Sequence, residues 1–279
     1  MGTPAFAVPS LRALAATTTL VGVVSQPDRP RGRGLTSQPS AVSAAANELG
    51  VPLFRPASVR TADTQAALAA WQPDILVVAA YGKILPPALL ALPTLAPINV
   101  HASLLPRYRG AAPIAASILA GDAATGVTIM LMSAALDAGD MLLQRTLPIS
   151  AEDTTESLTT ALAELGATAL TEALGALRDA GLQAEPQDVG RVTYAPRLAK
   201  DDGRVDWQRE AAAIERMVRA FTPWPSAFTT LGGRTVKILA ARVASDGRAD
   251  GIPGTIAVHG GTLRVVTGRG VLELLTLQA

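Results

Sequence analysis

The chain has 279 residues, of which 49% are hydrophobic, and its formal net charge is +1. This length exceeds what one hydrophobic core usually needs, so we expect two domains. The chain contains no cysteine, which excludes disulfides and thiolate metal sites and fits a reducing cytoplasm.

The first part of the chain alternates short apolar runs with helical stretches. Apolar runs bounded by Gly, Pro or polar residues predict buried strands at residues 20–25, 75–80, 98–101 and 126–132. Helices are predicted at residues 9–16, 61–70, 113–119 and 154–179. The alternation is typical of an α/β fold, a doubly wound, mostly parallel sheet with helices on both faces. Ligands of such folds bind at the carboxyl ends of strands.

The pattern changes after Gly181. Residues 182–200 have little periodicity and contain several Pro and Gly residues, which predicts a linker. One helix is then expected at residues 209–220, followed by β-type runs at 235–243, 254–258, 262–267 and 271–277. We therefore predict a first domain over residues 1–181 and, over residues 201–279, a small β-barrel.

Charge is distributed unevenly between these parts. Residues 1–190 carry 11 Lys/Arg against 15 Asp/Glu, and residues 191–279 carry 13 against 8. A basic C-terminal part favours an anionic partner such as nucleic acid, although chance variation in surface charge is about as good an explanation from composition alone. No apolar run approaches the roughly 20 residues that cross a bilayer, and the N-terminus lacks a secretory pattern. We expect a soluble, cytoplasmic protein.

The third predicted strand ends in two polar residues, Asn99 and His101. Strand geometry places both side chains on one face, because side chains alternate with a period of two. An amide and an imidazole at a strand's carboxyl end suit the polarisation of a carbonyl and the stabilisation of an oxyanion. An isolated histidine is more often a structural core residue. Asn99 at the same strand end favours the catalytic interpretation.

Asp137 follows the fourth predicted strand, in a Leu-Asp-Ala-Gly turn. A carboxylate facing His101 would fix its tautomer or move a proton, whereas Asp before Gly is also ordinary turn chemistry. No Gly-x-Ser-x-Gly elbow, Gly-x-Gly-x-x-Gly run or Walker loop occurs, which argues against a serine hydrolase and a nucleotide cofactor. The two histidines, His101 and His259, are far apart, so no metal site is expected.

A basic segment, residues 26–34, follows the first predicted strand and contains Arg29, Arg31 and Arg33. Such a loop suits contact with a phosphate backbone near the site. Most charged runs of this kind are solvated surface loops.

Four motifs together resemble methionyl-tRNA formyltransferases. They are residues 99–113 (NVHASLLPRYRGAAP), residues 126–132 with 136–139 (GVTIMLM and LDAG), residues 26–34, and residues 221–225 (FTPWP). The resemblance implies transfer of a formyl group from 10-formyltetrahydrofolate to the amino group of methionyl initiator tRNA, without a metal, for translation initiation. Related folate-dependent formyltransferases share the Asn-x-His and Leu-Asp-x-Gly elements.

The same resemblance implies roles for the matched positions. Asn99, His101 and Asp137 match the catalytic residues, and the C-terminal barrel is similar to an OB-like tRNA-binding module. The implied folate-binding residues are Ser103, Leu104, Leu105, Pro106, Tyr81, Gly82, Ile84 and Leu85. The implied tRNA-binding residues are Arg29, Arg31, Arg33 and Lys200.

The chain also departs from the family pattern. Family members have a strand before the Gly-Thr-Pro turn and a longer C-terminus, so we expect the first strand to be missing, with exposed strand edges, and the barrel to be truncated. Leu131, Ser133 and Ala135 replace usual residues of the catalytic turn and are expected to loosen it. We expect a monomer. Two other activities stay open, another folate formyltransferase or formyltetrahydrofolate hydrolase, and a non-catalytic tRNA-binding module.

Overall fold

The computed structural model describes residues 1–31, 36–181, 183–245 and 251–279, and for residues 29–31, 36 and 37 it describes the backbone alone. The chain forms two compact units. Unit 1 comprises Met1–Arg109, Thr125–Leu147 and Thr159–Tyr194. Unit 2 comprises Gly110–Ala124, Pro148–Leu158 and Ala195–Ala279. Unit 2 therefore draws on three separate stretches of the sequence.

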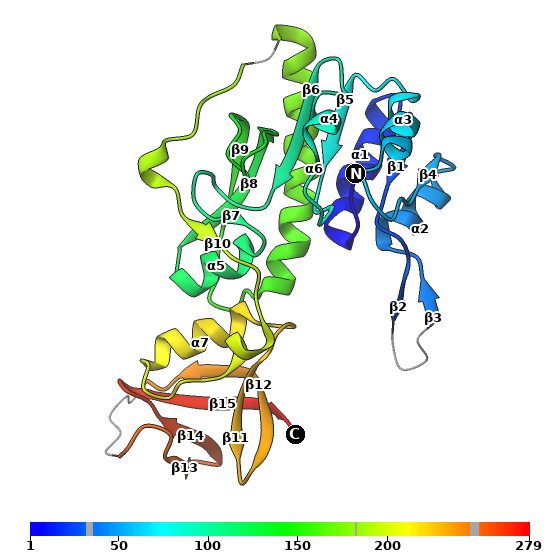
Figure 1. The fold of residues 1–279 in the computed structure, drawn as a ribbon. Coiled ribbons are helices and arrows are strands. Elements are labelled where there is room, and N and C mark those ends of the chain that lie inside the picture. Colours follow the sequence, from blue (N-terminus) through cyan, green and yellow to red (C-terminus); the bar gives the residue numbers. More distant parts are fainter. Residues whose placement is uncertain (32–35, 182, 246–250) are drawn as a thin grey trace. The chain divides into compact units, whose positions relative to one another are not determined.

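Unit 1 contains a four-stranded sheet in the order β5-β6-β8-β9 and a separate parallel pair, β1-β4 (Figure 1). Strand β6 runs parallel to β5 and antiparallel to β8. This arrangement confirms the predicted α/β fold class. The first predicted strand is much shorter than expected, and β4 and β9 were not predicted. The bounds are β1 Val23–Val24, β4 Leu53–Phe54, β5 Ile75–Val78, β6 Ala96–His101, β8 Ala124–Leu131 and β9 Met141–Pro148.

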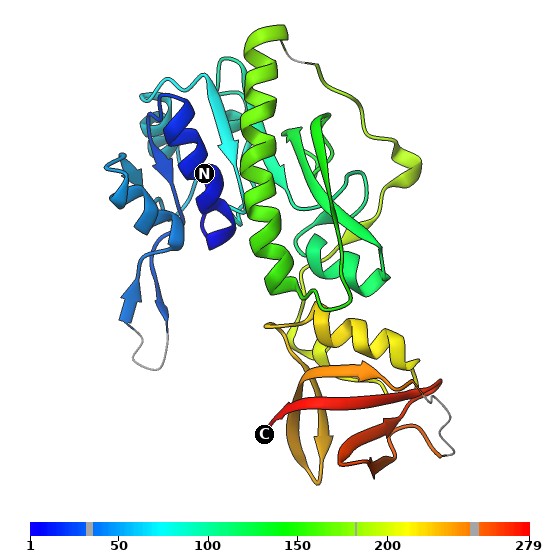
Figure 2. The same cartoon turned by 180° about the vertical axis from the view of Figure 1, so that it is seen from behind.

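Helix α6 crosses the face of the four-stranded sheet (Figure 2). Its Gly166 lies so close to the sheet that a Cβ there would be 2.9 Å from Cγ1 of Val100. The hydroxyls of Ser40 and Thr61 cap α2 and α3 by accepting backbone N–H groups of Ser43 and Thr64. The bounds are η1 Ala5–Ala7, α1 Val8–Thr17, α2 Ala41–Glu48, α3 Ala62–Ala69, α4 Pro87–Leu90, α6 Thr155–Ala180 and η2 Val189–Arg191.

The basic segment after β1 forms an antiparallel pair of short strands, β2 Arg29–Arg31 and β3 Thr36–Gln38. The backbone positions of Arg29 and Arg31 therefore lie in a paired strand. Arg33 lies outside the described residues.

The chain start lies between the two sheets of unit 1. Gly2 N–H donates to Val24 O at 3.0 Å, and Ala79 N–H donates to Met1 O at 2.9 Å. A cavity of about 430 Å³ lies beside this contact and is lined mainly by apolar residues of α1, β1 and β5, with Trp71.

Unit 2 contains a five-stranded antiparallel sheet in the order β11-β12-β15-β14-β13. The predicted barrel is wrong in one respect, because the described strands do not close. Helix α7 packs on β12 and β15 and buries Ile214, Met217 and Val218. The helix therefore covers one face of a sheet that is open. The bounds are α5 Pro113–Ala120, η3 Lys200–Gly203, α7 Ala211–Ala220, β11 Ala227–Leu231, β12 Arg234–Val243, β13 Ile256–His259, β14 Thr262–Val266 and β15 Val271–Gln278.

Two further strands, β7 Arg109–Gly110 and β10 Tyr194–Ala195, pair with each other. None of the helices that the structure describes has the length and apolarity of a membrane span.

Candidate active site

Strand β6 carries the two polar residues that the sequence singled out. Asn99 pairs with Val78 of β5 and Met130 of β8, and His101 pairs with Thr128 of β8. The two residues are two positions apart in one strand, so their side chains leave the same face of the sheet. His101 is only 6% exposed. The inner position of β6 thus places an imidazole and an amide at the carboxyl end of a strand with neighbours on both sides.

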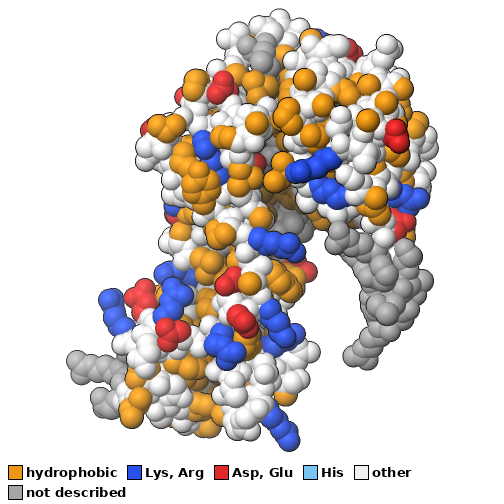
Figure 3. Space-filling view, viewed as in Figure 1, with side chains coloured by type: hydrophobic (Ala, Val, Ile, Leu, Met, Phe, Trp, Pro, Cys, Tyr) orange, Lys and Arg blue, Asp and Glu red, His pale blue; other side chains and the backbone are white. Residues whose placement is uncertain are grey.

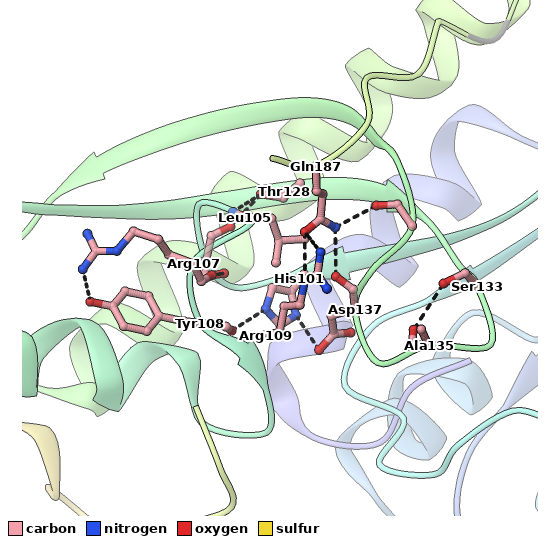
Figure 4. Close-up of polar contacts among 12 residues, drawn as sticks. His101, Leu105, Arg107, Tyr108, Arg109, Thr128, Ser133, Ala135, Asp137 and Gln187 are labelled. Atoms are coloured by element: carbon pink, nitrogen blue, oxygen red, sulfur yellow. Dashed lines mark hydrogen bonds and ion pairs between the residues drawn. The ribbon is translucent and has the colours of Figure 1, made fainter. Parts of the chain in front are cut away.

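Each nitrogen of the His101 ring has an oxygen atom beside it (Figure 4). Nε2 lies 3.0 Å from Tyr108 O, and Nδ1 lies 3.7 Å from Oδ2 of Asp137. A backbone carbonyl can only accept, so Nε2 carries the hydrogen of this bond. Nδ1 is then the nitrogen that faces the carboxylate. The expected pairing of His101 with Asp137 is therefore present, while Tyr108 O selects the tautomer.

Asp137 lies in the turn between β8 and β9, and its backbone φ is +45°. A residue with a side chain adopts this left-handed conformation only where its surroundings hold it. The turn closes through Leu131 N–H, which donates to Asp140 O at 2.9 Å. At Gly139 a Cβ would lie 1.9 Å from Leu131 O, so the turn packs directly on the end of β8.

Two residues that depart from the family pattern, Ser133 and Ala135, are hydrogen-bonded to each other. Ser133 Oγ donates to Ala135 O at 3.2 Å, and both residues are exposed. The expected loosening of the turn stays a prediction. The structure also places beside this turn two residues that the sequence did not single out, Gln187 and Arg109, both 8% exposed. A buried Gln in a segment without periodicity gives no sequence signal, and Arg is usually exposed.

The segment predicted to bind folate follows β6 and is firmly held. Ser103 is fully buried, and its Oγ donates to Arg107 O at 2.7 Å. Thr128 Oγ1 donates to Ser103 O at 2.7 Å and accepts from Leu105 N–H at 3.1 Å. Leu105 and Pro106 are buried, and Leu104 is half-buried. The backbone of this segment is thus fixed beside His101.

The second predicted folate-binding segment follows β5, the strand next to β6. Tyr81 is 1% exposed and Leu85 is 5% exposed, and both belong to the hydrophobic core of unit 1. Gly82 has a φ of +80°, and Ile84 is 71% exposed. The Tyr81 hydroxyl is buried and has no hydrogen-bond partner among the described residues. Burial raises the pKa of Tyr81, so the hydroxyl remains protonated and able to donate.

The predicted tRNA-binding residues lie in different units. Arg29 and Arg31 are in β2 of unit 1, and the exposed Lys200 begins η3 in unit 2. Figure 3 shows Lys and Arg side chains on the surface of unit 2, with Asp and Glu among them. Among the residues of this unit that the structure describes, the exposed basic ones are Arg197, Lys200, Arg204, Arg209, Arg234, Lys237, Arg242 and Arg269. No cluster of three or more His, Asp or Glu suited to a metal occurs in the described ranges.

Comparison with known proteins gives the same family along the chain. The family model described as formyl transferase matches residues 2–174, and the model described as formyl transferase, C-terminal domain, matches residues 197–279. A protein named methionyl-tRNA formyltransferase from Pseudomonas paraeruginosa is 51% identical over 280 residues, covering 99% of this chain and 89% of that protein. One from Marinobacter nauticus is 47% identical over 279 residues.

The fold is also that of a solved formyltransferase. The N-formyltransferase from Helicobacter canadensis, in complex with folinic acid and dTDP-3-aminofucose, has a TM-score of 0.73 and 16% identity, covering 98% of this chain and 96% of that one. At this identity the likeness concerns the fold alone. The sequence matches show that the chain belongs to the methionyl-tRNA formyltransferase family.

Proposed function

We propose that this protein transfers the formyl group of 10-formyltetrahydrofolate to the α-amino group of methionyl initiator tRNA. The proposal rests mainly on the similarity to a protein named methionyl-tRNA formyltransferase, which is 51% identical over 99% of this chain. The pairing of His101 with Asp137 at the end of β6 supports the proposal. Formyl transfer needs a group that stabilises the oxyanion and a group that moves a proton within the same site. The two alternatives, formyltetrahydrofolate hydrolase and a non-catalytic tRNA-binding module, predict different results in an acceptor assay.

In the proposed mechanism the free amine attacks the formyl carbon, and a tetrahedral oxyanion forms. The Asn99 amide and the Nδ1–H of protonated His101 donate to this oxyanion. The new carbon–nitrogen bond forms as the bond from the formyl carbon to the folate nitrogen breaks. One proton leaves the attacking amine and one reaches the folate nitrogen, so the charge balances. Asp137 stabilises the imidazolium and relays the proton.

Two features of unit 1 support folate as the donor. The segment Ser103–Pro106 follows β6, the strand that carries Asn99 and His101. Thr128 fixes its backbone through hydrogen bonds to Ser103 O and Leu105 N–H. The Tyr81 hydroxyl supplies a buried donor in the loop after β5, the strand that pairs with the Asn99 strand β6. A buried hydroxyl without a partner is costly unless a ligand satisfies it. Such a group fits a ligand that brings polar ring atoms into an apolar surrounding.

The basic residues support tRNA as the acceptor. Unit 2 presents exposed Lys and Arg, and strand β2 carries Arg29 and Arg31. A small amine acceptor requires neither feature, whereas a phosphate backbone attracts both. We also propose that the protein acts in the cytoplasm and as a monomer.

The test uses purified protein, donor labelled in the formyl group, and three acceptors: methionyl initiator tRNA, uncharged tRNA, and water alone. The proposal predicts label on the methionyl tRNA only. Release of labelled formate without labelled tRNA would identify a hydrolase. Binding of tRNA without consumption of donor would identify a binding module, and either result would overturn the proposal.

A further inference from the structure

A single buried side chain, Gln187, joins two parts of the site (Figure 4). Its Oε1 accepts from Arg109 Nε at 3.0 Å and from Arg109 Nη2 at 2.7 Å. Its Nε2 donates to Asp137 O at 2.9 Å and to Gly139 O at 2.7 Å. These four bonds use both acceptor positions and both hydrogens of the amide. The amide is therefore held in one orientation, with its donors toward the turn of Asp137.

The segment that carries this side chain, residues 185–193, is anchored on both sides of the site. Glu185 and Met141 exchange two backbone hydrogen bonds of 2.8 Å each, just after the turn of Asp137. At the other end Thr193 O accepts from Arg109 N–H at 2.9 Å, and Thr193 Oγ1 accepts from Tyr108 N–H at 2.9 Å. We call this segment the strap. It links the backbone that holds Asp137 to the backbone that holds Nε2 of His101.

We propose that Gln187 is a positioning residue that holds Asp137 in its left-handed conformation, so that the carboxylate faces Nδ1 of His101. A φ of +45° at a residue with a side chain is unfavourable by itself. Hydrogen bonds to the carbonyls of Asp137 and Gly139 fix the peptide group that follows Asp137 and the one that follows Gly139. The consequence for rate rests on the proposed function, whereas the placement of Asp137 does not.

The test variant is Gln187→Glu. Glutamate keeps an oxygen for Arg109, as a buried ion pair, and has no hydrogen for the two carbonyls of the turn. The strap thus stays attached while the turn is released. Gln187→Met, which removes all four bonds at similar size, is the second variant if the first does not fold. Gln65→Glu is the matched control, because Gln65 Nε2 also donates to a backbone carbonyl, Val59 O at 3.3 Å, in helix α3.

We expect Gln187→Glu to lower kcat by about tenfold to a hundredfold, since a small misplacement of a reacting group costs this much. KM for the folate donor should change by less than about twofold, because Gln187 acts through Asp137 and not on the donor. In an Asp137→Asn background the same change should cost nothing further. Gln65→Glu should keep the wild-type rate. An equal loss in both backgrounds would overturn the proposal.

A second readout needs no turnover. The chain has only two histidines, so ¹⁵N NMR signals of the His101 ring are assigned with a His259→Gln variant. Gln187→Glu should change the His101 signals in the same direction as Asp137→Asn, and Gln65→Glu should not. Unchanged His101 signals in Gln187→Glu would refute the positioning role. If the wild-type protein transfers no formyl group, the proposed function fails and these signals alone decide the role of Gln187.

Discussion

At the scale of single residues, the candidate site combines a strained residue with a close backbone contact. Asp137 has a positive φ, and Gly139 two positions later packs against Leu131 O. Both features set the direction of the Asp137 carboxylate, which lies 3.7 Å from His101 Nδ1. Without the positive φ at Asp137 and the close contact at Gly139, the Asp137 carboxylate could point in other directions. The geometry of the site is therefore sensitive to changes that touch no substrate.

Replacing Gly139 by alanine should disturb this turn. The added Cβ would lie 1.9 Å from Leu131 O, a backbone atom that cannot rotate away. We expect a loss of about 1–3 kcal/mol in the free energy of unfolding and a slower transfer rate. Gly175→Ala in α6 is the control, since no atom lies within 4 Å of its added Cβ. It should stabilise the protein slightly. Equal stability of the two variants in urea unfolding would contradict the packing argument.

The sequence contained enough to identify His101 and Asp137 as a pair, because a strand end and a Leu-Asp-x-Gly turn are local patterns. The hydrogen bonds that position these two residues could not be predicted from it. Tyr108 O selects the tautomer through a backbone atom, which no residue type reveals. Gln187 acts from a distant segment, and its partner Arg109 is a buried cation. Such contacts depend on tertiary structure alone.

At the scale of elements, helix prediction succeeded best where the helical pattern was long. Helix α6 was expected at residues 154–179 and spans Thr155–Ala180. Helix α2 was missed, because a short Ala-rich stretch gives no periodicity, although Ser40 caps it. In unit 2 the bounds of four strands were close, and β11 was not predicted. Closure into a barrel depends on pairing between distant strands, which periodicity does not report.

The centre of the unit 2 sheet contains a charged trio across three strands. Glu273 of β15 is 5% exposed and accepts from Arg242 of β12 and Arg264 of β14. Hydrogen bonds from Arg242 and then Arg264 lower the pKa of Glu273 below its ordinary value of 4.5. The folded state therefore binds its proton less readily than the unfolded state. This stabilisation is present above pH 4.5 and is lost as the pH falls through the lowered value.

Glu273→Gln should lower the melting temperature at pH 7, because two guanidinium groups lose a charged partner. As the pH falls below 4.5, the difference between wild type and variant should shrink, since Glu273 itself becomes neutral. Thermal unfolding followed by circular dichroism from pH 7 to pH 3 measures both effects. Melting curves that stay equally separated over this range would show that the trio does not titrate with folding.

At the scale of the whole molecule, charge separates the two ends of the chain. Residues 191–279 carry 13 Lys/Arg against 8 Asp/Glu, although the complete chain has a net charge of only +1. The overall balance therefore hides a basic C-terminal part. If this part binds tRNA phosphates, affinity should fall steeply with salt, because each neutralised phosphate releases counterions.

Lys200→Met should weaken tRNA binding and reduce the slope of log K against log salt concentration by about 1. Arg60→Met, an equal loss of charge at an exposed position of unit 1, should leave the slope unchanged. Fluorescence anisotropy at several salt concentrations provides the slopes. Equal slopes for Lys200→Met and wild type would remove Lys200 from the tRNA interface.

In the proposed mechanism, the Asn99 amide and the His101 imidazole of β6 stabilise the oxyanion of formyl transfer. The most direct measurement is the single-turnover rate of transfer to methionyl initiator tRNA in wild type and in Asn99→Ala, with both substrates saturating. We expect the rate of the variant to be slower by roughly a hundredfold to a thousandfold. A variant that transfers the formyl group at the wild-type rate would contradict it.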